Sequence, residues 1–219
     1  MREPINVSGM VLSVSPVGEY DKRVVILTRE LGKITAFARG ARRMKSPLMA
    51  VSNPFVFGEF QVYEGRDSYT LSGANIKEYF LDLAQMQPGV YYGFYFLELA
   101  EYFGQEGNDE TQMLNLLYVT MNAIRRGKQD LRLVRCIFEL RTITISGEAP
   151  QMFSCMECGT KENLTVFSLR DSAIYCQNCG KTIRDPWPLQ PGTVLACRYI
   201  IAAPLAKLYG FTVNEEILD

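Results

Sequence analysis

The 219-residue sequence contains no histidine. This absence excludes catalytic arrangements of the Ser-His-Asp and Cys-His kinds, because both use an imidazole as the general base. It also excludes every zinc site that has an imidazole ligand. Much hydrolytic and metal-dependent enzyme chemistry is therefore ruled out before any motif is considered.

Long apolar segments are also missing. No run of about eighteen residues is both apolar and uncharged, so we expect no membrane span. The first ten residues, MREPINVSGM, lack the apolar core of a secretory signal peptide. We therefore expect a cytosolic protein.

Other catalytic templates are incomplete. Gly32 and Lys33 resemble the end of a phosphate-binding loop, but Leu27 stands where the first glycine belongs, and Ile34 replaces the required Ser or Thr. A zinc deaminase needs a catalytic glutamate beside an open metal position, and the sequence shows neither. We predict a protein that is not an enzyme.

Positive charge is concentrated in one segment, although the formal net charge is −1. Residues 22–45 contain eight Lys or Arg side chains and one acid, Glu30. A local positive field governs encounter with polyanions even when the whole protein is nearly neutral. We predict phosphate contacts from seven of these cations: Lys22, Arg23, Lys33, Arg39, Arg42, Arg43 and Lys45. The alternative is a solvated basic loop without function. Phe37 in the same segment fits base stacking and core burial equally well.

The first third of the sequence has the pattern of short β-strands. Segments 5–17, 20–30, 32–40, 55–65 and 68–76 are rich in β-branched or aromatic residues and are separated by turn formers. Five short strands suit a small closed barrel, of which the oligonucleotide-binding (OB) fold is the commonest kind. An SH3-like barrel is the rival fold. We assign residues 1–77 to this domain.

The pattern changes to a helical period at Glu78. We predict helices over 76–86, 88–104, 109–127 and 129–147, and a last one over 192–210. In the third, Asp109 and Gln112 form a capping box, an apolar face follows, and Gly127 ends the helix. The apolar face consists of Met113, Leu117, Met121 and Ile124.

Arg125 and Arg126 lie in the last turn of this third helix. For both, a favourable interaction with the helix dipole is about as plausible as a ligand role. The aromatic run 91–96 is predicted to be core rather than a base-stacking surface. The fold class is therefore α+β, with a helical domain formed by residues 78–150 and 186–219.

Four cysteines follow the pattern C-x2-C-x17-C-x2-C: Cys155, Cys158, Cys176 and Cys179. Two residues between cysteines let one turn aim both thiolates at one ion, and two such turns complete a tetrahedral site. We predict one structural Zn²⁺, because four cysteine ligands leave no open coordination position. Disulfides and an iron–sulfur cluster are the weaker alternatives. The inserted zinc-ribbon-like module covers residues 151–185.

The other two cysteines, Cys136 and Cys197, lie in apolar helical segments and are predicted to be buried.

Three stretches together resemble one family. They are GEYDKRVVILTRELGKITAFARGARRMKS (18–46), FELRTITISGEAPQMFSCMECG (138–159) and CQNCG (176–180). The chain resembles RecO, the bacterial recombination mediator family, over almost all of residues 5–210. One departure is that family members usually continue through a further basic helix, whereas this sequence stops at VNEEILD.

The resemblance implies an OB-fold barrel, a helical core and a zinc-ribbon insert. It also implies binding of single- and double-stranded DNA, annealing of complementary strands, and help for RecA in replacing the single-stranded-DNA-binding protein. RecR is the implied partner, RecF completes the pathway, and the implied setting is the DNA-damage (SOS) response in the cytoplasm, at the nucleoid.

Arg132 and Arg135 are one helical step apart on the fourth predicted helix, so their side chains can project together. The resemblance implies that they receive the acidic C-terminal tail of the single-stranded-DNA-binding protein. Pairing with nearby acids such as Glu139 is the slightly favoured alternative. At the level of the whole chain, the alternatives are an RNA-binding or translation-associated barrel protein with a zinc ribbon, or an interaction scaffold.

Overall fold

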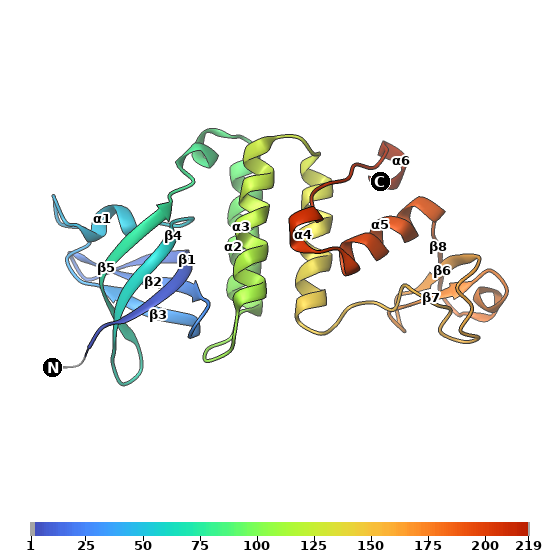
Figure 1. Ribbon diagram of the computed structural model, residues 1–219, viewed down its shortest axis with the longest axis horizontal. Helices are drawn as coiled ribbons and strands as arrows, with labels where there is room; N and C mark the ends of the chain where they lie inside the picture. The colour runs from blue at the N-terminus through green and yellow to red at the C-terminus, as the bar shows by residue number, and fades with distance from the viewer. Residues whose placement is uncertain (1–2, 219) are drawn as a thin grey trace. The chain divides into compact units, whose positions relative to one another are not determined.

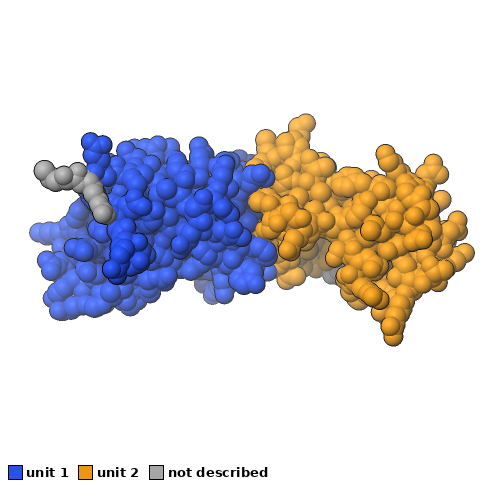
Figure 2. Space-filling view, turned by 90° about the horizontal axis from the view of Figure 1, so that it is seen from below, with its two compact units in different colours: residues 1–127 blue, residues 128–219 orange. Residues whose placement is uncertain are grey.

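The computed structural model describes residues 3–218, so Met1, Arg2 and Asp219, at the ends of the predicted first and last domains, lie outside the described residues. Backbone contacts divide the chain into two compact units, residues 1–127 and 128–219, which Figure 2 colours separately. Each unit is described by itself. The finer division at 77/78, 150/151 and 185/186 stays a prediction.

Unit 1 begins with a closed five-stranded barrel (Figure 1). Its strands are β1 (Ile5–Val17), β2 (Asp21–Thr28), β3 (Gly32–Ala38), β4 (Phe57–Glu64) and β5 (Tyr69–Glu78). The order around the barrel is β1-β2-β3-β5-β4, and only the β3–β5 pairing is parallel. This is the Greek-key order of the OB fold, so the predicted five-stranded OB barrel is confirmed.

The long strand β1 closes the barrel. Its first half pairs with β4, from Ile5↔Val62 to Met10↔Phe57, and most of its length pairs with β2. The β1–β2 register shifts between Val11 and Ser13, which lets one strand bend through both pairings. Alternate side chains point inward and form a core of Val, Ile, Ala, Leu and one aromatic ring, Phe60.

The connection from β3 to β4 contains a short helix that the sequence pattern did not predict, α1 (Leu48–Val51). Four residues are too few to show a helical period. Leu48 and Val51 are buried in the barrel core, so tertiary packing rather than local propensity fixes this turn.

The predicted helix over 76–86 is wrong. Strand β5 runs to Glu78, and only η1 (Leu81–Gln85) is helical, as a 3-10 turn. Phe80 between them has a left-handed backbone (φ 49°) and a buried ring. Glu78 Oε1 accepts hydrogen bonds from the backbone N–H groups of Tyr79 (3.1 Å) and Phe80 (3.3 Å). The backbone N–H groups of Tyr79 and Phe80 therefore have hydrogen-bond partners without forming a helix.

The two long helices of unit 1 are α2 (Gly89–Phe103) and α3 (Thr111–Arg126). The predicted apolar face of α3 is buried, and Gly127 ends the helix with φ 59°. The predicted capping box is wrong, because Asp109 Oδ1 accepts from the backbone N–H of Thr111 (2.9 Å) and Glu110 is the N-cap.

The aromatic run on α2 is only partly core. Phe96 is fully buried, whereas Tyr91, Phe94 and Tyr95 are exposed. Consecutive residues point about 100° apart on a helix, so an unbroken aromatic run cannot lie on one face.

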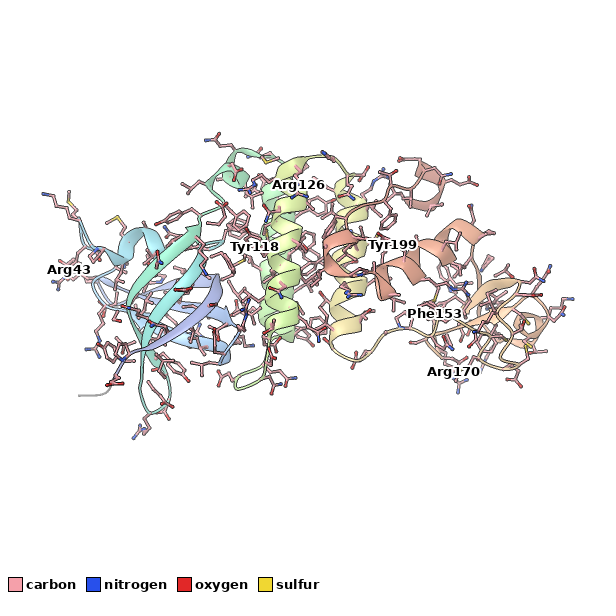
Figure 3. The ribbon with its side chains drawn as sticks, in the orientation of Figure 1. Arg43, Tyr118, Arg126, Phe153, Arg170 and Tyr199 are labelled. Carbon is pink, nitrogen blue, oxygen red and sulfur yellow. The ribbon has the colours of Figure 1, made fainter. Side chains whose placement is uncertain are left out.

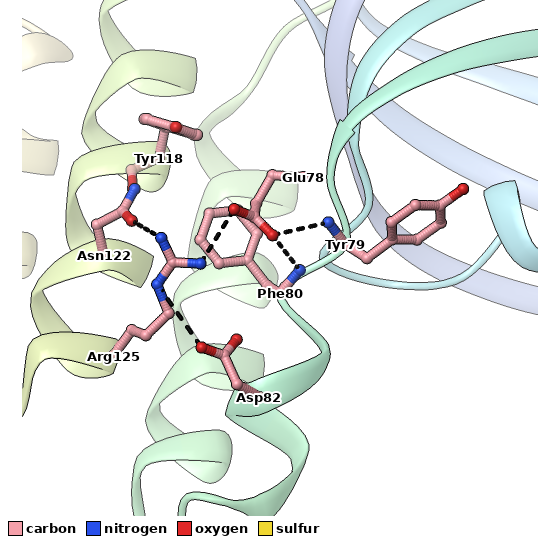
Figure 4. A network of polar contacts seen from close by, with 7 residues as sticks. All are labelled: Glu78, Tyr79, Phe80, Asp82, Tyr118, Asn122 and Arg125. Carbon is pink, nitrogen blue, oxygen red and sulfur yellow. Dashed lines mark hydrogen bonds and ion pairs between the residues drawn. The ribbon is translucent and has the colours of Figure 1, made fainter.

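Arg125 of α3 connects the helices to the end of β5 (Figure 4). Its guanidinium donates to Glu78 Oε2 (3.0 Å) and to Asn122 Oδ1 (2.6 Å), and it lies 3.7 Å from Asp82 Oδ2. It also covers the Phe80 ring at 5.3 Å. Because these contacts occupy the side chain, Arg125 is a structural residue of unit 1.

A second connection joins the α2–α3 connector to the β2–β3 turn. Lys33 N donates to Gln105 O (2.8 Å), and Gly107 N donates to Leu31 O (3.0 Å). At Gly32, where φ is +69°, an added Cβ would lie 2.2 Å from Gln105 O. The close backbone approach therefore requires glycine there.

Unit 2 contains three helices and a small sheet: α4 (Leu131–Ile145), β6 (Leu164–Ser168), β7 (Ala173–Cys176), β8 (Pro186–Pro188), α5 (Pro191–Ala202) and α6 (Glu215–Leu218). Two 3-10 turns, η2 (Cys179–Thr182) and η3 (Leu205–Lys207), complete it. The sheet order is β7-β6-β8, so the Pro-Trp-Pro strand belongs to the small sheet. Helix α5 is shorter than predicted, because Pro204 disfavours helical backbone at Ala203, which is extended.

Helices α4 and α5 are tied together by Arg141, whose guanidinium donates to the carbonyl oxygens of Ile200 and Ile201. Asp130 caps α4 by accepting from Arg132 N (2.7 Å). Over residues 3–218 no helix has the length and apolar character needed to cross a lipid bilayer.

Candidate nucleic-acid interface and metal centre

A groove of about 600 Å³ lies on the outer side of the barrel, between the β2–β3 face and the β4–β5 hairpin. The β2–β3 side contributes Arg23, Lys33, Thr35 and Phe37, and the hairpin side contributes residues 64–69. This is the surface that OB folds use for oligonucleotides, namely strands 2 and 3 with the neighbouring loops.

Phe37 lies in the groove rather than in the core. Strand β3 alternates between buried Ile34, Ala36 and Ala38 and partly exposed residues, and Phe37 is one of the latter. It pairs with Arg23 on β2. Tyr69 lies opposite Ala36 in the parallel β3–β5 pairing and lines the same groove. An aromatic ring next to a guanidinium is a common platform for a nucleic-acid base.

The charges in the groove are mixed. Arg23 Nη2 donates to Thr35 Oγ1 at 3.4 Å, and Lys33 Nζ donates to the Glu101 carbonyl at 2.6 Å. Burial raises the pKa of Tyr69, and the charges of Glu64 and Glu106 raise it further. A lysine ammonium has three N–H donors, so after the bond to Glu101 O Lys33 can still donate to a phosphate.

The basic loop, residues 39–45, folds against the β1–β2 turn. Gly40 N donates to Asp21 Oδ1 (2.7 Å), and Arg42 N donates to Tyr20 O (2.8 Å). Arg42 Nη1 also donates to Gly18 O at 3.2 Å, and the Arg43 guanidinium lies 4.8 Å from the Tyr20 ring centroid. Figure 3 labels Arg43 on this loop. The loop therefore has a defined conformation.

The four cations of the basic loop are Arg39, Arg42, Arg43 and Lys45, and all are exposed. None of them forms an ion pair with a carboxylate in the part of the chain that the structure describes. Lys22 is beside this loop: its Nζ donates to Ser52 O and Asn53 Oδ1, and burial together with the charge of Arg42 lowers its pKa. The seven predicted cations thus form two groups, five at the loop and two, Arg23 and Lys33, in the groove.

The four predicted metal ligands lie together in unit 2. Cys155 and Cys158 precede β6, Cys176 ends β7, and Cys179 begins η2. Their Sγ atoms are all within 4.8 Å of one another, and the Cys158–Cys176 distance is 3.9 Å. A tetrahedral Zn²⁺ with Zn–S bonds of 2.3 Å would set the sulfurs about 3.8 Å apart. All four thiols are free, so the cluster could hold one ion and no disulfide is formed.

The thiols of this cluster do not ionise alike. Burial opposes ionisation of Cys155, but backbone N–H groups at Cys158, Cys176 and Glu157 lower its pKa to about 6. Hydrogen bonds with Cys176 and Cys158 raise the pKa of Cys179 to about 12. A cysteine binds a metal as a thiolate, so metal binding must displace the proton that Cys179 shares with the neighbouring sulfurs.

Two family models match the sequence: Recombination protein O N terminal over residues 1–80, and Recombination protein O C terminal over residues 89–219. Together they cover nearly the whole chain. The chain belongs to the RecO family.

Individual relatives agree with this assignment. The DNA repair protein RecO of Alkaliphilus metalliredigens is 33% identical over 97% of this chain and 87% of its own length. The RecO proteins of Bacillus pumilus (31%) and Bacillus subtilis (28%) align with 97% and 95% of this chain, and with 82% and 81% of their own lengths. The resemblance to RecO stated from the sequence is confirmed.

The RecO fold places Arg132 and Arg135 on one exposed side of α4, and both have acidic neighbours. Arg132 Nη2 donates to Asp130 Oδ2 (2.9 Å) and to Glu215 Oε1 (2.7 Å), and Arg135 Nε lies 3.2 Å from Glu139 Oε1. Hydrogen bonds with Asp130 and Glu215 raise the pKa of Arg132. A role in partner binding stays a prediction.

Sequence reasoning missed several groove residues of this RecO chain. The sequence pattern assigns Arg66 to a turn and Tyr69 to a strand, although the loop between strands 4 and 5 is one that OB folds use for nucleic acids. The prediction that Cys136 is buried is wrong, since Cys136 is exposed, and Cys197 is only partly buried. Helical period alone does not say which side of α4 another element covers.

Proposed function

We propose that this RecO chain binds single- and double-stranded DNA through the barrel. The observation that carries the proposal is the basic loop: four exposed cations without carboxylate partners among residues 3–218. The loop directly follows β3, whose Phe37 lines an OB-type groove together with Tyr69. In this proposal Arg39, Arg42, Arg43 and Lys45, with Lys22, contact phosphates, and Arg23 and Lys33 extend the path into the groove. Such contacts give affinity without sequence preference.

Binding without sequence preference suits strand annealing, which must accept any pair of complementary strands. We propose that the chain anneals complementary strands and assists RecA in replacing the single-stranded-DNA-binding protein. RecR and RecF are the proposed partners in the same pathway, at the nucleoid in the cytoplasm. The proposed role is not catalytic, and Zn²⁺ on Cys155, Cys158, Cys176 and Cys179 would stabilise unit 2 without taking part in a reaction.

The proposed site for the acidic tail of the single-stranded-DNA-binding protein is Arg132 with Arg135. The pairing of Arg132 with Glu215 gives this proposal a specific consequence. A tail carboxylate would have to take the place of Glu215, so Glu215 would compete with the tail.

The test of DNA binding is fluorescence anisotropy on mixed-sequence oligonucleotides over a salt series. Arg42→Glu/Arg43→Glu should weaken binding to all sequences alike and flatten the slope of log K against log salt by roughly one to two units, since each phosphate contact on a single strand contributes about 0.7. Glu3→Lys/Glu19→Lys changes the charge by as many units with the opposite sign and should not weaken binding. Unchanged affinity and slope in a folded double mutant would place the DNA site elsewhere.

Annealing is tested with two complementary oligonucleotides, one carrying a fluorophore and the other a quencher. The parent chain should speed annealing without ATP, and Arg42→Glu/Arg43→Glu should lose most of this effect. A structured RNA competitor separates this function from the RNA-binding alternative. Stronger binding to the RNA than to single-stranded DNA would favour the alternative.

A further inference from the structure

One side of helix α2 carries large aromatic side chains that are open to solvent. The exposed fractions are 62% for Tyr91, 49% for Phe94, 37% for Tyr95 and 80% for Tyr102. Glu98 lies between them in the sequence and is also exposed. At 100° per residue these five positions fall within one stripe about 100° wide, which we call the tyrosine face.

The orientation of this face is fixed by the other side of α2. Phe96, Leu97 and Ala100 are buried, and Gly93 leaves room for the Phe55 ring, which an added Cβ would approach to 2.9 Å. At the edge of the tyrosine face, Phe94 also meets the Phe55 ring edge-on, with ring centroids 4.7 Å apart. The helix therefore cannot turn to bury the tyrosine face without losing these contacts.

The exposed aromatic area is large for a single helix. With about 200 Å² for a whole aromatic side chain, the four rings expose on the order of 450 Å². Single exposed apolar residues are ordinary, but a contiguous patch of roughly 300–600 Å² is often functional. Tyrosine and phenylalanine are also enriched at the centre of protein interfaces.

The charges on α2 favour a protein over a nucleic acid as the occupant. Residues 89–103 contain Glu98 and Glu101 and no Lys or Arg. Aromatic platforms for nucleic-acid bases are combined with cations that hold the phosphates, as in the basic loop. The charged residue within the tyrosine face is Glu98, and its negative charge would repel a phosphate backbone.

The position of Glu98 also argues against a second copy of this chain. A two-fold symmetric pair brings the same patch of both copies together. Because Glu98 lies near the middle of the stripe from Tyr91 to Tyr102, its carboxylate would then face its own counterpart and lose its hydration. A different protein that brings a cation to this point offsets this cost, because the cation pairs with the carboxylate.

We propose that the tyrosine face is a docking surface for a protein partner that meets it with apolar side chains around a lysine or arginine paired with Glu98. This inference rests on the proposed function, which supplies RecR as the protein partner. RecR is therefore the probe, and purified full-length chains are used throughout.

The experiment measures RecR affinity by calorimetry for the parent and for Tyr91→Ala/Tyr102→Ala. These side chains are mostly exposed, so their removal should leave the fold intact, and anisotropy on single-stranded DNA checks this. RecR binding should weaken by tenfold or more, since truncation of central aromatic residues causes the largest losses at interfaces. Glu98→Lys should weaken it by a similar factor, and Glu98→Gln by less.

The matched control is Tyr63→Ala/Tyr79→Ala, which removes two exposed tyrosines of unit 1 outside α2 and should change RecR affinity less than twofold. If RecR binds the parent and the α2 variant equally, the tyrosine face is not the docking surface and the proposed partner stands. If RecR does not bind the parent, both the partner and this inference fail. A parent dimer in sedimentation that Tyr91→Ala/Tyr102→Ala converts to a monomer would assign the face to self-association instead.

Discussion

The barrel and the four-cysteine module both contain antiparallel strand pairs, but they differ in strand length and in the composition of their cores. The barrel strands are 7 to 13 residues long and enclose an apolar core. The strands β6, β7 and β8 have five, four and three residues, and the buried core of the module includes two of the four clustered cysteines, Cys155 and Cys176. A closed barrel buries enough apolar area to fold without a metal, whereas we expect so small a sheet to need an ion bound at its four cysteines.

The largest effect is expected from removing one metal ligand. Cys176→Ser should abolish stoichiometric zinc and unfold the module, because structural zinc contributes roughly 10–16 kcal/mol in small zinc-binding peptides. Elemental analysis should find about one zinc in the parent chain. Trp187, the one tryptophan of the sequence, lies on β8, so its fluorescence reports on this module alone.

The matched control for the metal prediction is Cys136→Ser, which changes an exposed cysteine outside the cluster and should keep both zinc and the Trp187 signal. DNA binding by the barrel should survive in Cys176→Ser. A metal-free parent with two disulfides, or a Cys176→Ser chain with an unchanged Trp187 signal, would contradict the prediction that the module depends on a bound metal ion.

The next largest effect is expected in the barrel. Phe60 is fully buried on β4, and Phe60→Ala should cost about 3–5 kcal/mol of unfolding free energy through lost burial and an unfilled cavity. Denaturant unfolding followed by circular dichroism measures the loss. Zinc content and the Trp187 signal should not change. Loss of zinc from Phe60→Ala would show that the module depends on the barrel core.

Each unit also has one arginine between two carboxylates, and these two sites sharpen the comparison. The Arg125 side chain is 33% exposed and Arg132 is 41% exposed. Arg125 also covers the Phe80 ring and bonds Asn122, whereas Glu215, which pairs with Arg132, is 70% exposed. We expect the first site to be structural and the second to exchange partners.

For the second site, Arg132→Glu/Arg135→Glu should weaken binding of a peptide with the acidic tail sequence of the single-stranded-DNA-binding protein by tenfold or more. Glu215→Gln should strengthen it a few-fold, because the carboxylate that competes for Arg132 is gone. Glu216→Gln, at a carboxylate bonded to Gln190, should change it little. Calorimetry with the peptide measures all three. Equal binding by the parent, Arg132→Glu/Arg135→Glu and Glu215→Gln means that the tail docks elsewhere.

The smallest effect concerns pH. Burial opposes ionisation of Glu78, but hydrogen bonds from Arg125 and from the amides of Phe80 and Tyr79 outweigh it and lower its pKa below the ordinary 4.5. A lowered pKa in the folded state gives stability that is present above pH 4.5 and is lost as pH falls through the folded value. Glu78→Gln should therefore cost less than about 1 kcal/mol at pH 7 and flatten the acid-side loss. Parallel pH profiles for the two chains would exclude this carboxylate as a contributor.

Local patterns predicted most of the elements and the metal cluster. The alternation in residues 5–76, the apolar stripe of α3 and the C-x2-C pairs each act over a few neighbouring residues, and the structure has the barrel, the helix and the cluster that they indicate. The excess of positive charge in residues 22–45 is likewise a local property, because it can be counted from the sequence without knowledge of the fold.

Tertiary structure decided what depends on residues far apart in the sequence. Phe80 and Glu78 end β5 and prevent a helix because Arg125, 47 residues away, completes their contacts. Phe37 joins Tyr69 in a groove only because β3 pairs with β5. Helical period gives the exposed stripe of α2, but burial of its opposite side shows that Tyr91 and Tyr102 face solvent. The physical reason is that periodicity fixes which residues share a side, while only packing decides which side is covered.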